Sequence, residues 1–202
     1  MRRSAATGAA LATMLLVAAC GSSGPTPPSS ASPAPRSAAP ALASPTACNL
    51  PVGAAPTALD PGLLSVLPAR VGGVAVAQEP DSFSQAMADP CFAANVDRAV
   101  FAIAVSGDDL ASGVVAHLRP GVYSDAMFAD WRSSYDDGAC AQAGGVVGHA
   151  QQTLALRTTY VTTCGGGLRV YHAYLPGKGA IVSLFSTGPN DFGAQLVSGI
   201  AG

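Results

Sequence analysis

The side chains most suited to chemistry gather in one short stretch of this sequence, residues 128–136, where aromatic and charged residues mix. Trp131, Arg132 and Tyr135 fall at helical spacing within it. In one interpretation the helix packs its aromatic stripe on a sheet, and Arg132 pairs with Asp136 one turn later. In the other, Trp131 and Tyr135 line a ligand groove where the helix meets the sheet, beside a later strand. The candidate groove residues are Trp131, Arg132, Tyr135, Tyr171, His172 and Tyr174.

Three histidines, His117, His149 and His172, each lie on or beside a stretch with strand character. Three imidazoles on one face of adjacent strands could bind a metal ion. No spacing such as H-E-x-x-H accompanies them, and separate strands can place three residues far apart. We therefore interpret them as unrelated histidines and expect neither a metal site nor a cofactor.

The sequence lacks a complete catalytic motif. There is no G-x-S-x-G around which a serine hydrolase could be built. The adjacent acids Asp108–Asp109 and Asp136–Asp137 are typical of a turn and a helix end, whereas a glycosidase needs two acids facing a cleft. Gly165, Gly166 and Gly167 lack the Lys of a phosphate-binding loop and favour a tight turn. The sequence therefore leans towards a protein that is not an enzyme.

The amino terminus has the layout of a secretory signal peptide. Arg2 and Arg3 precede an apolar run over residues 5–19, and Cys20 follows. The run is too short to span a hydrocarbon core of about 30 Å comfortably. An ordinary cleaved signal and a retained anchor helix are the alternatives to the interpretation that follows.

The end of that run, L-V-A-A-C, resembles the lipobox of bacterial lipoproteins. The resemblance implies that residues 1–19 are a cleaved signal peptide and that Cys20, acylated with diacylglycerol, becomes the new amino terminus. Residues 20–47 are mostly Pro, Ser and Ala, with some Gly and Thr, a composition that predicts a disordered linker. We expect the protein to be exported and held at the cell membrane by its lipid, with the folded domain on the extracytoplasmic side.

Four further cysteines, Cys48, Cys91, Cys140 and Cys164, would be exposed to an oxidising space in an exported protein. Four cysteines allow three disulfide connectivities. Cys140 and Cys164 bracket a predicted hairpin, which favours this pair and leaves Cys48 with Cys91. A metal site is the alternative, but no two cysteines have the close spacing that zinc motifs usually show.

Residues 48–202 read as a single α+β domain. Strands are predicted over residues 71–77, 99–105, 112–118, 145–150, 153–163, 168–175 and 180–186, and helices over 61–67, 81–88, 91–98, 124–138 and 190–200. Short turns between successive strands predict a mainly antiparallel sheet in a two-layer fold, with the helices packed on one face. The element order is loosely similar to that of the Mog1/PsbP-like lipoproteins.

The low charge of the sequence limits the classes of partner that we expect. Charged residues make up 11% of the chain, its formal net charge is −2, and no basic stripe is present, so we expect no nucleic-acid binding. The sequence favours a lipoprotein of the cell envelope whose domain binds a small ligand or another envelope protein without catalysis. The alternatives are an envelope hydrolase or metal-dependent enzyme and a purely structural assembly factor.

Overall fold

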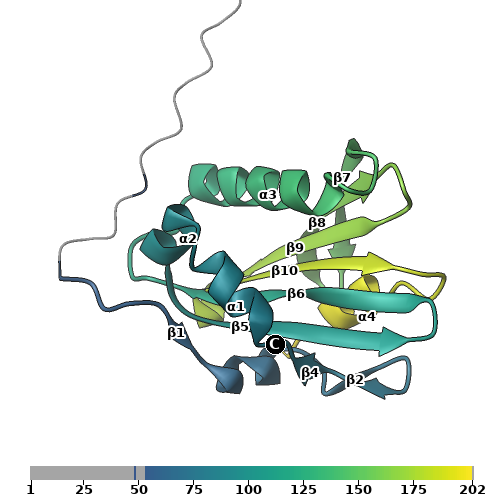
Figure 1. The fold of residues 1–202 in the computed structure, drawn as a ribbon, viewed down its shortest axis with the longest axis horizontal. Helices are drawn as coiled ribbons and strands as arrows, with labels where there is room; N and C mark the ends of the chain where they lie inside the picture. Colours follow the sequence, from purple (N-terminus) through teal and green to yellow (C-terminus); the bar gives the residue numbers. More distant parts are fainter. Residues whose placement is uncertain (1–47, 49–52, 202) are drawn as a thin grey trace, which may run out of the picture. The chain divides into compact units, whose positions relative to one another are not determined.

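A mainly antiparallel sheet of eight strands organises the computed structural model, which describes residue 48 and residues 53–201 (Figure 1). Its strands are β1 (Ala58–Leu59), β4 (Ala77–Gln78), β5 (Val96–Ser106), β6 (Asp109–Leu118), β7 (Val146–Leu154), β8 (Arg157–Cys164), β9 (Arg169–Leu175) and β10 (Ala180–Thr187). They lie in the order β1-β5-β6-β10-β9-β8-β7, and β4 also pairs with β5. Strand β1 runs parallel to β5, and the other pairs are antiparallel. The predicted α+β class is confirmed.

The helices are α1 (Asp81–Ala86), α2 (Pro90–Asn95), α3 (Asp125–Cys140) and α4 (Phe192–Ser198), with short 3-10 helices η1 (Pro61–Val66) and η2 (Pro176–Lys178). Helix α3 begins as predicted, because the Ser124 hydroxyl accepts a hydrogen bond from the backbone N–H of Met127 at 3.1 Å. The predicted end at Gly138 is wrong. An interior glycine costs about 1 kcal/mol, and the burial of Cys140 beyond it offsets that cost.

Helices cover both faces of the sheet rather than the single face that we expected. Because side chains alternate along a strand, Ile181 of β10 packs in the cluster of α2 and α3 while Val182 and Leu184 pack with Phe192 of α4. Figure 1 shows α1 and α2 in front of the strands and α4 behind them. Apolar residues on both faces of β10 therefore require a cover on each side.

Two predicted segments divide differently in the structure. The strand expected over residues 71–77 is broken into β2 (Arg70–Val71), β3 (Val74–Ala75) and β4, because Gly72 and Gly73 take positive φ values and turn the chain. The turn expected at Gln151–Gln152 lies instead at Ala155–Leu156, and β7 continues through the glutamines. Strand β7 is an edge strand, so polar side chains within it stay in water and do not mark a turn.

Both disulfides are present with the expected connectivity, Cys48–Cys91 and Cys140–Cys164. They indicate that the chain matures in an oxidising, extracytoplasmic compartment. None of the helices within residues 53–201 is long and apolar enough to cross a membrane. The predicted signal peptide, the candidate lipidation site Cys20 and the predicted linker over residues 20–47 lie outside the described residues.

Candidate functional site

The register of the sheet sets polar side chains side by side on the face that α3 covers. Gln151 of β7 lies opposite Tyr160 of β8, Tyr160 opposite His172 of β9, and His172 opposite Ser183 of β10. His149 and Thr162 form the neighbouring pair, two residues along on β7 and β8. Strand periodicity places these residues on one face, and the pairing gathers them from four strands.

Helix α3 presents a matching stripe to this face. Phe128, Arg132 and Asp136 follow one another at four-residue spacing, so they point to the same side of the helix. Cys140 continues the stripe and is bonded to Cys164 at the end of β8. The cap at one end and the disulfide at the other therefore hold α3 across the strands.

A buried chain of hydrogen bonds joins α3 to the sheet. The Trp131 indole Nε1–H donates to the Ser183 hydroxyl oxygen at 2.9 Å. Ser183 lies 2.8 Å from His172 Nδ1, and His172 Nε2 lies 2.9 Å from Asp136 Oδ1. Because an indole only donates and an ionised carboxylate only accepts, Ser183 donates to His172, and His172 donates to Asp136.

Two further side chains, Thr162 and His149, connect this chain of hydrogen bonds to the molecular surface. The Thr162 hydroxyl donates to Asp136 Oδ2 at 2.6 Å and accepts from His149 Nδ1–H at 2.9 Å. Side-chain exposure rises from 4% at Asp136 to 66% at His149. This arrangement leaves His149 Nε2 available to a molecule outside the protein.

The two buried ionisable groups are held in complementary states. Burial is the largest influence on the pKa of His172 and lowers it below the ordinary value of 6.5, although the hydrogen bond to Asp136 opposes the shift. Burial would raise the pKa of Asp136, but hydrogen bonds from His172 and Thr162 outweigh it and lower the pKa below 3.8. At neutral pH the pair is thus a neutral imidazole and a carboxylate.

Ser183, His172 and Asp136 share their residue types with a hydrolytic triad, but their setting does not suit that chemistry. Ser183 and His172 are both fully buried, and neither lines either of the two principal cavities of the described residues. A nucleophilic serine must reach a substrate carbonyl. We therefore assign the chain of hydrogen bonds from Trp131 to Asp136 a structural role: it positions the side chains that lie above it.

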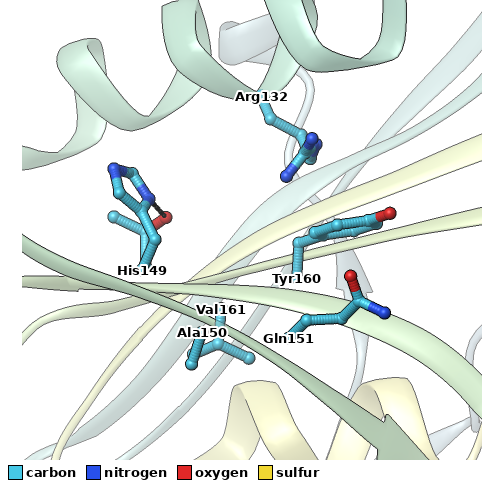
Figure 2. Close-up of a pocket in the computed structure, with 7 residues that line it drawn as sticks. Arg132, His149, Ala150, Gln151, Tyr160 and Val161 are labelled. Carbon is cyan, nitrogen blue, oxygen red and sulfur yellow. Dashed lines mark hydrogen bonds between the residues drawn. The ribbon is translucent and has the colours of Figure 1, made fainter. Parts of the chain in front are cut away.

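A cavity of about 230 Å³ opens above these hydrogen bonds, between α3 and the β7–β8 hairpin. Figure 2 shows Arg132 reaching from α3 toward Tyr160, with His149 and Gln151 on the neighbouring strand. The lining residues are Arg132, His149, Ala150, Gln151, Tyr160, Val161 and Thr162. The lining mixes polar and apolar side chains and contains no carboxylate.

Arg132 is the unusual group of this cavity. Its guanidinium lies 3.7 Å from the centre of the Tyr160 ring and 5.1 Å from that of Phe128. Its Nε is buried without a hydrogen-bond partner, and within the described residues it forms no ion pair. The expected pair with Asp136 is absent: Asp136 accepts hydrogen bonds from His172 and Thr162, while the Arg132 guanidinium packs over the Tyr160 ring.

The six predicted groove residues separate into three groups. Arg132 lines this cavity, and Tyr174 lines a second, adjoining one. His172 is buried beneath α3, Tyr135 packs against its ring, and Trp131 packs on Phe92. Tyr171 points to the opposite face, where its hydroxyl donates to Asp191 at 2.5 Å, because it is one position out of phase with His172 on β9.

Sequence reasoning missed Gln151, Tyr160, Thr162 and Ser183 as members of the site, and weighed His149 for a metal alone. Their alternation along predicted strands placed pairs of them on one face, and short turns indicated that successive strands pair, but no local signal indicated the register or the face that α3 covers. Within residue 48 and residues 53–201 no cluster of His, Cys, Asp or Glu is suited to a metal ion. His117 lies apart, with its Nδ1 3.7 Å from Asp97 Oδ2.

Comparison of the chain with known protein families, characterised proteins and solved structures finds no match. The assignment of function therefore depends on the geometry of the site.

Proposed function

We propose that this protein is an exported, lipid-anchored binding protein whose domain binds a small anion, without catalysis, in the cavity between α3 and the β7–β8 hairpin. The observation that carries the proposal is Arg132, a guanidinium with five donors that lines the cavity, whose buried Nε has no hydrogen-bond partner and which forms no ion pair within the described part of the chain. A planar guanidinium of this kind matches a carboxylate or phosphate group.

The surrounding side chains support the same class of ligand. The Gln151 amide and His149 Nε2 can each donate to an anion at the cavity mouth, the histidine when protonated. Tyr160 holds the guanidinium plane by its ring face, which limits the entropy lost on binding. Asp136 is the nearby carboxylate, and its two hydrogen bonds occupy it beneath the cavity.

The anchoring part of the proposal depends on the sequence of residues 1–21. The basic start, the short apolar run and the L-V-A-A-C ending support acylation of Cys20. The Pro-, Ser- and Ala-rich residues 20–47 would act as a spacer between the lipid and the domain. A membrane-tethered binding domain in the cell envelope fits these features together.

The proposal is tested by calorimetric titration of the mature chain carrying Cys20→Ser, which cannot be acylated and needs no detergent. Phosphate and acetate serve as probes. We expect Arg132→Gln to raise the Kd for the bound anion about tenfold, since a hydrogen bond to a charged group contributes about 1.5 kcal/mol or more. Arg98→Gln is the matched control, because it removes an arginine of β5 that pairs with Asp60. It should leave the Kd unchanged. Equal affinity in the Arg132→Gln variant and the unsubstituted chain would contradict the proposal.

A further inference from the structure

A second cavity adjoins the anion site on the same face of the sheet. It measures about 650 Å³ and lies where β8, β9 and the start of α3 meet. Its apolar lining consists mainly of Tyr123, Phe128, Leu156, Tyr160, Tyr174 and Pro176. We call it the aromatic groove. Tyr160 lines both cavities, so the aromatic groove and the anion site share a wall.

Arg132 stands at the junction of the two cavities. Its guanidinium packs against Tyr160, which borders both, and against Phe128, which borders the aromatic groove. Arg157 and Thr158 also line the aromatic groove, but the Arg157 guanidinium donates to the backbone carbonyls of Val197 and Ile200, at 3.4 and 3.5 Å. The charge of Arg132 thus lies at one end of a mainly apolar trough. This charge pattern is complementary to a molecule with an anionic head and an apolar body.

The hairpin tip provides an independent observation. Ala155 and Leu156 have φ values of 47° and 65°, a left-handed conformation that costs about 1–2 kcal/mol for each residue with a side chain. Asn-Gly is the sequence that such turns favour. Leu156 is moreover 98% exposed while it lines the aromatic groove. The strained turn thus holds a large apolar side chain in water beside the aromatic groove, and strained backbone is retained most often at functional sites.

We propose that the ligand is a single-chain amphiphilic anion, whose carboxylate or phosphate head lies at Arg132 and whose hydrocarbon body lies in the aromatic groove against Leu156. The inference rests on the proposed anion site and adds the chemical class of the ligand. Burial of an alkyl chain against Leu156, Tyr174 and Phe128 removes apolar surface from water on both partners.

The test is a chain-length series of n-alkyl carboxylates, acetate, hexanoate and decanoate, titrated below their aggregation concentrations into the mature chain carrying Cys20→Ser. We expect the Kd to fall roughly twofold per added methylene, about half the effect of complete burial because the groove is open on one side. Alkyl phosphates of the same lengths distinguish a fatty carboxylate from a lipid phosphate head. Decanol, which lacks the charge, should bind at least tenfold more weakly than decanoate.

Leu156→Ser is the diagnostic variant, because an almost fully exposed side chain can be replaced without disturbing the core. It should weaken decanoate binding at least threefold and leave acetate binding unchanged. Val147→Ser, which replaces an apolar side chain of β7 that is 63% exposed and outside both cavities, is the matched control and should change neither.

The two proposals fail in different ways. If anions bind in an Arg132-dependent manner but chain length has no effect, the amphiphile is excluded and the anion site stands. If neither acetate nor decanoate binds, or if Arg132→Gln changes nothing, both are overturned. Binding of decanol as tightly as decanoate, or binding only to micelles and vesicles, would also overturn the amphiphile proposal.

Discussion

At the scale of single residues, the site consists of a buried, satisfied chain and an unsatisfied cation above it. Asp136 keeps its charge because His172 and Thr162 donate to it, and Arg132 packs over the Tyr160 ring instead of pairing with this carboxylate. The charge of Arg132 in turn disfavours protonation of His172. The neutral state of His172 therefore depends in part on Arg132, the cation to which we assign anion binding.

The state of His172 predicts how stability depends on pH. Its pKa in the folded chain lies below 6.5, so on acidification the unfolded chain takes up a proton that the folded chain does not. The resulting contribution to stability is present above pH 6.5 and is lost as the pH falls below that value. Asp136, with its pKa lowered from 3.8, adds a loss only at lower pH.

We therefore expect the urea midpoint to fall between pH 7 and pH 5, and to fall less in a His172→Gln variant. That variant should also lose about 1–3 kcal/mol at pH 7, because it disturbs buried hydrogen bonds. His117→Gln, at a histidine outside this network, is the control and should leave the difference between the unsubstituted chain and His172→Gln unchanged when both carry it. An equally steep pH dependence in His172→Gln would show that His172 titrates normally.

At the scale of elements, the site depends on how α3 and the β7–β8 hairpin are held together. Helix α3 is joined to β8 by the Cys140–Cys164 disulfide and to β9 and β10 by the Asp136–His172–Ser183 chain. The hairpin tip, in contrast, contains the strained pair Ala155–Leu156. In the proposed function, helix α3 would position the anion and the hairpin tip would supply the apolar contact.

A substitution that relieves this strain should stabilise the fold and at the same time weaken binding of the proposed ligand. The double substitution Ala155→Asn with Leu156→Gly gives the turn residues that accept positive φ values, and we expect it to raise the free energy of unfolding by about 1–2 kcal/mol. Urea denaturation measures the gain, and titration with decanoate should show weaker binding in the same protein. No gain in stability would contradict the strain assigned to the tip.

At the scale of the whole molecule, two disulfides connect the parts of the domain. Cys48–Cys91 ties the start of the described chain to α2, and Cys140–Cys164 closes the end of α3 on the sheet. Disulfides that close loops of 43 and 24 residues stabilise a domain by about 3–4 kcal/mol each. Such linkages suit a protein that functions outside the cytoplasm.

The intact mass of the protein isolated from membranes tests the location and the cysteine chemistry together. We expect a chain that begins at a diacylglycerol-modified Cys20, takes up no alkylating reagent before reduction, and is alkylated at its other four cysteines after reduction. An unmodified mass would contradict the lipid anchor. Alkylation before reduction would contradict the disulfides, so the two conclusions are judged separately.

Much of the fold was predictable because its signals are local. The β-branched run at residues 99–105 became β5, Ser124 caps α3 as expected, and Cys140 pairs with Cys164 because a hairpin lies between them. The errors were local as well. Helix α3 continues past Gly138. The turn predicted at Gln151–Gln152 was wrong because an exposed edge strand can contain the same polar residues as a turn.

The sequence by itself determined the fold class and favoured the disulfide pairs that the structure contains, since the period of each element and the cysteines at the ends of a predicted hairpin are visible in the sequence. Only the tertiary structure decided the site. The strand order places His172 of β9 between Ser183 of β10 and Asp136 of α3, and it leaves Arg132 without a carboxylate. Contacts between residues 11 to 52 positions apart depend on the register between the strands and on the face of the sheet that α3 covers, and no local pattern encodes either.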